Sequence, residues 1–406
     1  MMYTSVDLGS HSIKIIVSRK VDDKYYVLAS TCVNSRGIKR GIIKDKELAL
    51  ESLKEAVNNI NKNLGIKIKK VLLNFPLYEL NTTIESGEMV VAGTVTGENI
   101  RELIRKTVKE SISDNLEVIY LEPIVFEVDG GIQVVDPKGL DTNHLKVRLA
   151  VSTISKTILY EYLTLLQGAG LVVDDLAYGI VGDYIEGTTK EINRNLSVVL
   201  NIGYSKTEIA IFNKGIMLKG KLLPIGSKKI DKDISYIYKI DRDIACNLKE
   251  NFASCSSNYA DKYDTMEVDN LAGEKVTINQ LEISQVVEAR LKEILKSVKL
   301  EINNLTNREI SYIIVTGGIT NMNGFSYLLD DFFDMEKVIC NVTPIGIRSN
   351  IYSSCLGIIK YIDKKMNFRE IDYTMFDEKE IDKLTSKEDK VSSDNLITKL
   401  ESYLKS

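Results

Sequence analysis

Two stretches of this chain, far apart in the sequence, have the same pattern of residues. Residues 5–17 read SVDLGSHSIKIIV, and residues 199–211 read VLNIGYSKTEIAI. The two align without a gap, so that Gly9 falls on Gly203 and Asp7 falls on Asn201. A self-match of this kind indicates that one structural unit is used twice. Because β-branched residues flank the glycine in both stretches, each predicts a strand, a tight turn and a second strand.

The rest of the chain also falls into two similar halves. With 406 residues it is too long for one simple core, so more than one domain is expected. Each half opens with a three-stranded meander, at residues 3–31 and 196–224, and continues with helices and buried strands. Between the meanders, short strands around one helix at residues 81–155 form a separate unit.

Composition excludes several kinds of protein. The net charge of -4 gives no basic surface, so nucleic acid is not expected as a partner. The five cysteines contain no CxxC pair and the two histidines form no cluster, so we expect buried thiols in a reducing cytosol and no structural zinc. The chain enters a strand at once and has no long apolar run, so neither a signal peptide nor a membrane span is expected.

The chemistry of the hairpins suits phosphate. A glycine-bent hairpin can aim backbone N–H groups at one point, and such a nest binds phosphate oxygens. Ser10, His11 and Ser12 add side-chain donors at the first bend, and Lys14 can reach a phosphate as a point charge. Asp7 can hold Mg²⁺ through water. One such hairpin alone also fits an ordinary turn, but two aligned copies favour a pair that clamps a nucleotide.

A third motif, IIVTGGITNMNG at residues 313–324, ends a buried strand with two glycines. Gly317 and Gly318 let the backbone approach a flat base or a ribose, where a side chain would collide. Taken alone, the motif also fits a plain turn from strand to helix. The two hairpins upstream favour contact with a ligand.

Hairpin, hairpin and TGG strand in this order resemble the phosphate-1, phosphate-2 and adenosine motifs of the actin, Hsp70 and sugar-kinase ATPase superfamily. Within it, residues 1–365 resemble the FtsA family of bacterial cell-division proteins. The segments that carry this resemblance are NSRGIKRGIIKD, FEVDGGIQVVDPKGL, VVEARLKEIL, VTGGITNMNGF and VTPIGI.

The resemblance implies an α/β, actin-like duplicated ATPase fold of two lobes with mixed five-stranded sheets, and a small inserted α+β (1C-type) subdomain. The first lobe (1A) is expected at residues 1–81 and 156–195, with the inserted 1C subdomain between them at 82–155. The second lobe (2A and 2B) is expected at 196–365, with 2B at approximately 226–309. A flexible linker at 366–395 and an amphipathic helix at 396–406 are expected to follow. The linker also follows from composition, because that stretch is charged and poor in core residues.

The resemblance also implies the ligands, ATP and Mg²⁺, and the residues that bind them. Phosphate and magnesium are assigned to Asp7, Gly9, Ser10, His11, Ser12 and Lys14. The second phosphate loop is assigned to Asn201, Gly203, Tyr204, Ser205 and Lys206. Adenosine is assigned to Gly317, Gly318 and Ile319, and the base or ribose also to Lys249 or Glu250.

One residue departs from the superfamily pattern. The second hairpin carries Asn201 where most of the superfamily has Asp. Asparagine has no charge, so it cannot act as a base or attract magnesium. We therefore expect no catalytic residue, at most a slow ATPase, and a nucleotide that acts as a conformational ligand. The alternative is that Asn201 caps a turn in a site that no longer binds ATP.

The last residues predict a short amphipathic helix. One stripe holds Leu396, Ile397, Leu400, Tyr403 and Leu404, and polar residues lie opposite. The pattern alone fits docking on protein as well as on lipid. The resemblance favours lipid, because the family's membrane-targeting helix has this position.

The function implied is that of an actin-like scaffold that polymerises on the cytoplasmic face of the cell membrane at the division site. It would tether FtsZ filaments there, with the FtsZ C-terminal peptide on its second lobe, and would contact other division proteins. A PilM-like pilus-assembly scaffold and a small-molecule kinase of the same superfamily are the alternatives. The kinase needs an acidic base facing a second cleft, and a PilM-like protein lacks such a tail.

Overall fold

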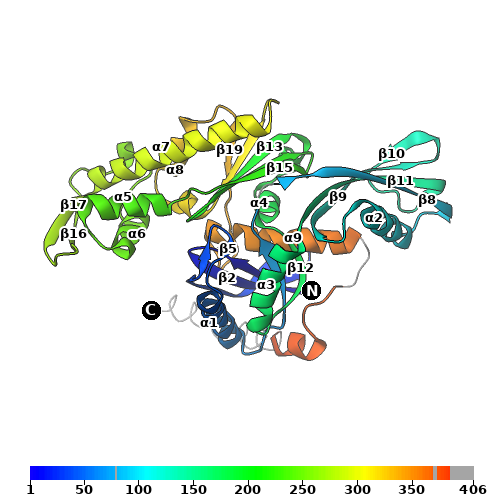
Figure 1. Cartoon of the computed structure of the whole chain (residues 1–406), viewed down its shortest axis with the longest axis horizontal. Helices are drawn as coiled ribbons and strands as arrows, with labels where there is room; N and C mark the ends of the chain where they lie inside the picture. Colours follow the sequence, from blue (N-terminus) through cyan, green and yellow to red (C-terminus); the bar gives the residue numbers. More distant parts are fainter. Residues whose placement is uncertain (78–79, 369–372, 385–406) are drawn as a thin grey trace, which may run out of the picture.

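The computed structural model describes residues 1–77, 80–368 and 373–384 of the chain. Two lobes form its centre (Figure 1), and each is built on a sheet of the same topology. The first sheet has the order β12-β6-β1-β2-β3, and the second has the order β19-β18-β13-β14-β15 with one further strand, β7, at its edge. The predicted α/β fold of two lobes with mixed five-stranded sheets is confirmed.

The strands of the first sheet are β1 (Met2–Leu8), β2 (Ser12–Val21), β3 (Lys24–Asn34), β6 (Lys70–Phe75) and β12 (Val172–Tyr178). Those of the second are β7 (Leu80–Asn81), β13 (Leu196–Ile202), β14 (Thr207–Asn213), β15 (Ile216–Leu223), β18 (Tyr312–Thr316) and β19 (Glu336–Ile339).

The repeat seen in the sequence is also a repeat of strand register. Val6 pairs with Ile15 in the first hairpin, and the aligned residues Leu200 and Ile209 pair in the second. In both lobes the first strand also runs parallel to a buried strand, β6 or β18. Both first strands are buried on two faces, and in β1 this burial includes the polar residues Thr4 and Ser5.

Helices cover the first sheet. They are α1 (Lys46–Leu64), α3 (Lys156–Gly168), α4 (Gly179–Gly187) and α9 (Ser353–Phe368), with the short strands β4 (Ile38–Lys39) and β5 (Ile42–Ile43) before α1. The side chain of Asp45 caps the start of α1, and Gly65 ends it in a left-handed conformation.

Two glycines let α4 and α9 cross at close range between the lobes. Helix α4 contacts β13 and β18 of the second sheet, and α9 contacts β1 and β6 of the first. A Cβ placed on Gly357 would lie 1.9 Å from the carbonyl oxygen of Gly182. Any larger residue at Gly357 would therefore force the two helices apart.

The inserted unit has a sheet and a core of its own. Its elements are β8 (Thr83–Thr94), α2 (Gly97–Ser111), β9 (Leu116–Val128), β10 (Ile132–Val134) and β11 (Asp141–Ser155). The antiparallel sheet β10-β9-β11-β8 and α2 enclose a separate apolar cluster around Leu103, Phe126 and Leu149. Strand β7 leads into this unit by pairing with β15, so the insert is attached to the second sheet as well as to the first lobe.

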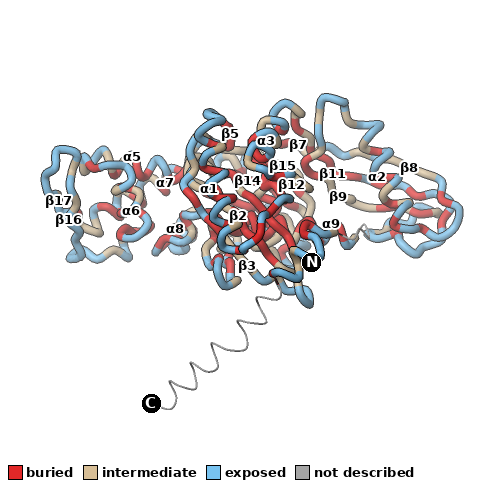
Figure 2. Tube along the Cα trace, turned by 90° about the horizontal axis from the view of Figure 1, so that it is seen from below, coloured by how far each residue is buried: buried red, intermediate tan, exposed pale blue. Residues whose placement is uncertain are grey.

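The second lobe has its own outer unit, at the opposite end of the molecule from the insert (Figure 1). It consists of α5 (Lys228–Tyr238), α6 (Arg242–Asn251), β16 (Thr265–Asp269), β17 (Lys275–Asn279) and α7 (Gln280–Leu305). Helix α8 (Phe325–Asp330) follows β18. Figure 2 shows buried residues concentrated in the two central lobes, while the outer units are more exposed.

The chain after α9 differs from the linker predicted at residues 366–395. Met366, Met375, Phe376 and Leu384 are buried and join the core of the first lobe. Among the described residues 366–368 and 373–384 the linker prediction is therefore wrong, because a few apolar side chains suffice to dock a charged segment. The predicted helix at 396–406, with Leu396, Ile397, Leu400, Tyr403 and Leu404, lies outside the described residues. No helix in the described part of the chain is long and apolar enough to cross a membrane.

Candidate functional site

A cavity of about 600 Å³ lies between the two lobes, where the ends of both hairpins meet. The residues predicted from the sequence that line it are Asp7, Gly9, Ser10, His11, Ser12, Lys14, Asn201, Gly203, Tyr204, Ser205, Lys206, Lys249, Glu250, Gly317, Gly318 and Ile319. The structure thus brings together in one place all sixteen residues, which the sequence had placed in three motifs and in the helix that carries Lys249 and Glu250. Their roles toward a ligand remain predictions.

The two turns have the same tight geometry. A Cβ on Gly9 would lie 2.7 Å from the carbonyl oxygen of Ser12, and a Cβ on Gly203 would lie 3.1 Å from that of Lys206. In each hairpin the turn glycine faces the carbonyl three residues further on. A side chain at Gly9 would clash with this carbonyl, and one at Gly203 would fit only tightly.

The turns face each other across the cavity. The backbone N–H of Arg40 donates to Oγ of Ser10 and to Oγ of Ser205, each at 3.0 Å. The rings of His11 and Tyr204 lie 4.4 Å apart between their centres. The hairpins of the two lobes are therefore near enough to hold one ligand from both sides.

Charged groups are arranged differently in the two hairpins. In the first, Nζ of Lys14 lies 2.5 Å from Oδ2 of Asp7, its partner across the strands. Burial, the largest single effect, lowers the pKa of Lys14, but attraction to Asp7 and to the neighbouring thiols together raises that pKa overall. In the second, the acid is Glu208, opposite Asn201. Sequence reasoning missed Glu208, although its place opposite Asn201 in the hairpin pattern could have indicated it.

Glu208 is held in place from two directions. Its Oε1 accepts a hydrogen bond of 2.6 Å from the backbone N–H of Leu77 and one of 2.7 Å from Nζ of Lys206. The side chain is almost fully buried. The second hairpin therefore keeps a carboxylate at the cavity wall even though Asn201 has none.

Behind Asn201 lies a buried carboxyl group that the sequence analysis also missed. Nδ2 of Asn201 donates to Asp183 at 2.6 Å, and Oγ of Ser353 donates to the same carboxyl group at 2.6 Å. Burial raises the pKa of Asp183 to about 7, against the opposing effect of these two hydrogen bonds. An aspartate within the otherwise apolar start of α4 was the available signal.

Lys249 is paired with a buried carboxylate of the protein, that of Asp231. Its Nζ lies 2.7 Å from Oδ1 of Asp231, and both side chains are almost fully buried. The ammonium group also lies 5.8 Å from the centre of the Tyr204 ring. Of the two predicted residues on α6, the exposed Glu250 is therefore better placed to reach a ligand.

The glycines after β18 differ from each other. Gly317 has φ of 100°, and a Cβ there would lie 2.4 Å from the carbonyl oxygen of Ile202. A Cβ on Gly318 would meet only Ile351, at 3.4 Å. Gly317 is therefore fixed by the fold, whereas Gly318 leaves room that a ligand can use.

Two duplicated lobes around a cavity lined by paired glycine hairpins define a protein of the actin-like ATPase fold. Solved structures with the same fold include the PilM–PilN type IV pilus biogenesis complex, with a TM-score of 0.58 and 12% identity, covering 88% of this chain and 98% of that one. MreB5 of Spiroplasma citri bound to ADP has a TM-score of 0.57 and 13% identity, covering 92% and 99%. At these identities the likeness concerns the fold alone.

Sequence comparison narrows the class further. The family model "Cell division protein FtsA" matches residues 198–357. The cell division protein FtsA of Bacillus subtilis is 26% identical, covering 93% of this chain and 87% of its own length. That of Staphylococcus epidermidis is 27% identical, covering 95% and 85%. Over most of its length the chain is thus similar to cell-division proteins of the FtsA family, the resemblance that the sequence motifs had predicted. The resemblance to PilM is structural and does not favour the pilus alternative.

Proposed function

We propose that the cleft binds ATP with Mg²⁺. The bound nucleotide then controls the position of the two lobes relative to each other. The observation that carries this proposal is that both hairpins and the glycine end of β18 line one cavity of about 600 Å³. This volume is within the usual range for small-molecule sites. The ADP bound to MreB5 of Spiroplasma citri, a structural neighbour, supports the same class of ligand.

Each part of the cleft has one task in this proposal. Backbone N–H groups at the two turns, residues 9–12 and 203–206, cradle phosphate oxygens. Gly318 and Ile319 pack against adenosine, and Glu250 accepts hydrogen bonds from ribose hydroxyls. Lys249, held by Asp231, supports the Tyr204 ring at the second turn.

The donors at the first hairpin fit a magnesium ion. Asp7 offers carboxylate oxygens, the type of ligand that Mg²⁺ prefers, and its side chain is 22% exposed toward the cavity that it lines. Bound there with most of its water, the ion would neutralise phosphate charge. Lys14 beside Asp7 supplies a second positive charge for the same phosphates.

Hydrolysis is expected to be slow. Asn201 donates its amide to Asp183 and has no charge with which to activate water. Asp183 does not line the cavity and is fully buried. A basal ATPase rate near the common enzyme median of about 10 per second would contradict this part of the proposal.

We further propose that the chain polymerises on the cytoplasmic face of the membrane at the division site and tethers FtsZ filaments to it. Similarity to cell-division proteins of the FtsA family supports a cell-division role. The insert and the α5–α7 unit lie at opposite ends of the molecule (Figure 1), an arrangement suited to head-to-tail stacking into open filaments. The FtsZ C-terminal peptide would bind the second lobe, and the tail at 396–406 would bind lipid.

Co-sedimentation with anionic vesicles tests the scaffold. The full chain should carry FtsZ into the vesicle pellet in the presence of Mg-ATP. Leu400→Glu should leave both proteins in the supernatant, whereas Thr398→Glu, with the same charge on the polar side of the predicted helix, should not. If Leu400→Glu sediments like the parent chain, the tail is not the anchor.

Deletion of residues 82–155 tests the filament contact separately. If this deletion leaves filaments intact, the insert is not the filament contact.

A further inference from the structure

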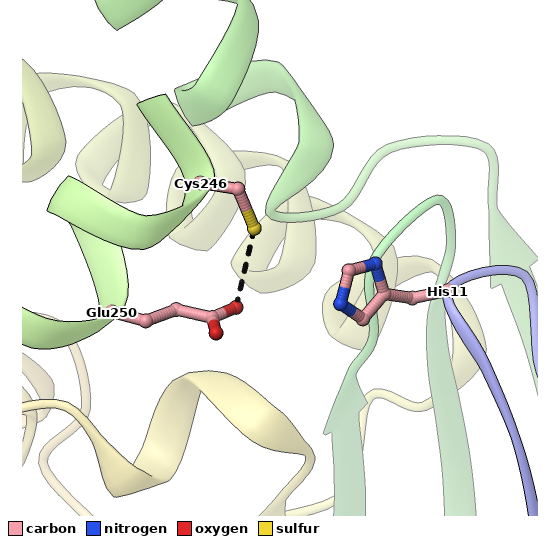
Figure 3. A group of neighbouring side chains, drawn as sticks. All are labelled: His11, Cys246 and Glu250. Atoms are coloured by element: carbon pink, nitrogen blue, oxygen red, sulfur yellow. Dashed lines mark hydrogen bonds between the residues drawn. The ribbon is translucent and has the colours of Figure 1, made fainter. Parts of the chain in front are cut away.

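Three side chains with metal-binding atoms converge beside the cleft, from segments far apart in the sequence. His11 belongs to the turn of the first hairpin, and Cys246 and Glu250 lie one helical turn apart on α6. An imidazole nitrogen, the thiol sulfur and a carboxylate oxygen all lie within 4.8 Å of one another. Figure 3 shows that the His11 ring points toward the other two side chains.

The spacing requires only a small adjustment to hold an ion. Zinc binds nitrogen and oxygen at about 2.0 to 2.2 Å and sulfur at about 2.3 Å, so that two of its ligands lie roughly 3.5 Å apart. Sγ of Cys246 and Oε1 of Glu250 already lie 3.5 Å from each other. His11 and Glu250 are exposed, and their side chains can rotate toward a shared ion without disturbing the core.

The donor set selects the class of metal. One thiolate and one carboxylate supply two negative charges, which balance a divalent cation, and an imidazole completes a mixed set of nitrogen, oxygen and sulfur. Such sets favour zinc and its neighbours over magnesium, which prefers oxygen ligands alone. Three protein ligands leave a fourth, open position for water.

The positive charge of Lys249 beside Cys246 does not oppose such an ion strongly. Nζ of Lys249 lies 3.7 Å from Sγ of Cys246. That ammonium group is itself paired with the buried carboxylate of Asp231 at 2.7 Å. The Lys249–Asp231 pair therefore contributes little net charge to the site.

We propose that His11, Cys246 and Glu250 bind one zinc-class divalent ion, which links the first hairpin to α6 across the edge of the cleft. Because His11 comes from the first lobe and the other two ligands from the second, the ion fastens the lobes to each other. The sequence alone gave no sign of this site, since it contains neither a CxxC pair nor a histidine cluster.

Titration of the nucleotide-free full chain with Co²⁺ tests the proposal directly, because a cobalt–thiolate bond produces a charge-transfer band in the near ultraviolet. The parent chain should show this band, saturating at one ion per chain. Cys246→Ser should abolish it. His11→Ala and Glu250→Gln should each lower the affinity for Co²⁺ by more than about tenfold. Loss of even an outer-shell partner of a metal ligand costs at least about that much, and these two residues are the ligands themselves.

Cys32→Ser is the control, because Cys32 is an exposed thiol that lines the cleft but does not belong to the proposed site. It should leave the cobalt band unchanged. Zinc should raise the melting temperature of the parent chain and of Cys32→Ser but not of Cys246→Ser, since only a folded site gains from the ion. Absence of the band in the parent chain, or its persistence in a folded Cys246→Ser protein, would overturn the proposal.

Discussion

Asn201 donates a hydrogen bond of 2.6 Å to the buried carboxyl group of Asp183, so the second hairpin is tied to α4 directly behind the cleft. Ser353, the first residue of α9, donates to the other oxygen of the same carboxyl group. The hydroxyl oxygens of Ser353 and of Thr316, at the end of β18, lie 2.6 Å apart. One buried network thus connects a hairpin, two crossing helices and the glycine strand.

This network predicts a specific dependence of stability on pH. The pKa of Asp183 is raised to about 7 by burial, whereas in the unfolded chain it is about 4. The folded state therefore holds a proton that the unfolded state has lost, and stability falls as pH rises from about 4 to about 7. The slope from this one group is at most about 1.4 kcal/mol per pH unit.

Asp183→Asn should remove that slope, because the amide resembles the protonated acid in shape. Melting temperatures measured at pH 5 and pH 8 should differ less in Asp183→Asn than in the parent chain. The exposed Asp114→Asn serves as the control and should behave like the parent. An unchanged difference between the two pH values in Asp183→Asn would show that Asp183 is ionised throughout.

The adjacent glycines after β18 should respond differently to substitution. Gly317→Ala forces a side chain into a positive φ and against the carbonyl of Ile202, so it should destabilise the fold by about 1 to 3 kcal/mol. Gly318→Val should leave the melting temperature nearly unchanged but weaken ATP binding by filling the cleft. Calorimetry and thermal melting separate the two effects. Unchanged ATP affinity in Gly318→Val would place adenosine elsewhere.

The crossing of α4 and α9 gives a third prediction. Gly357→Ala places a methyl group against the backbone of Gly182 and should cost about 1 to 3 kcal/mol by overpacking. Gly168→Ala at the end of α3 is the control, since its Cβ would meet only the Leu50 side chain. Equal melting temperatures for the two variants would mean that the helices can separate without cost.

The sequence predicted the duplicated fold well because the repeat is local. Each hairpin shows its glycine and its β-branched flanks within thirteen residues, and the paired strands follow from them. The same local signal placed the candidate residues of the two hairpins, since turns at the ends of equivalent strands meet at the same edge of their sheets. Lys249 and Glu250 came from the family resemblance instead.

What the sequence could not provide depends on contacts between distant segments. Asp183 lies behind Asn201 only because α4 is brought against the second hairpin, and the hydrogen bond from Leu77 that holds Glu208 likewise joins distant segments. The pairing of Lys249 with Asp231 depends on how α5 packs on α6. The docking of Met375 and Phe376 was hidden by the charged residues around them. None of these contacts leaves a periodic pattern in the chain.

Calorimetric titration of Mg-ATP into the full chain tests the central claim most directly. The parent chain should bind one nucleotide, and Asp7→Ala should weaken binding in the presence of Mg²⁺ more than in its absence, because Asp7 is the proposed magnesium residue. Absence of any heat of binding up to millimolar ATP would contradict the account, since the paired hairpins would then enclose a cleft that no longer binds nucleotide.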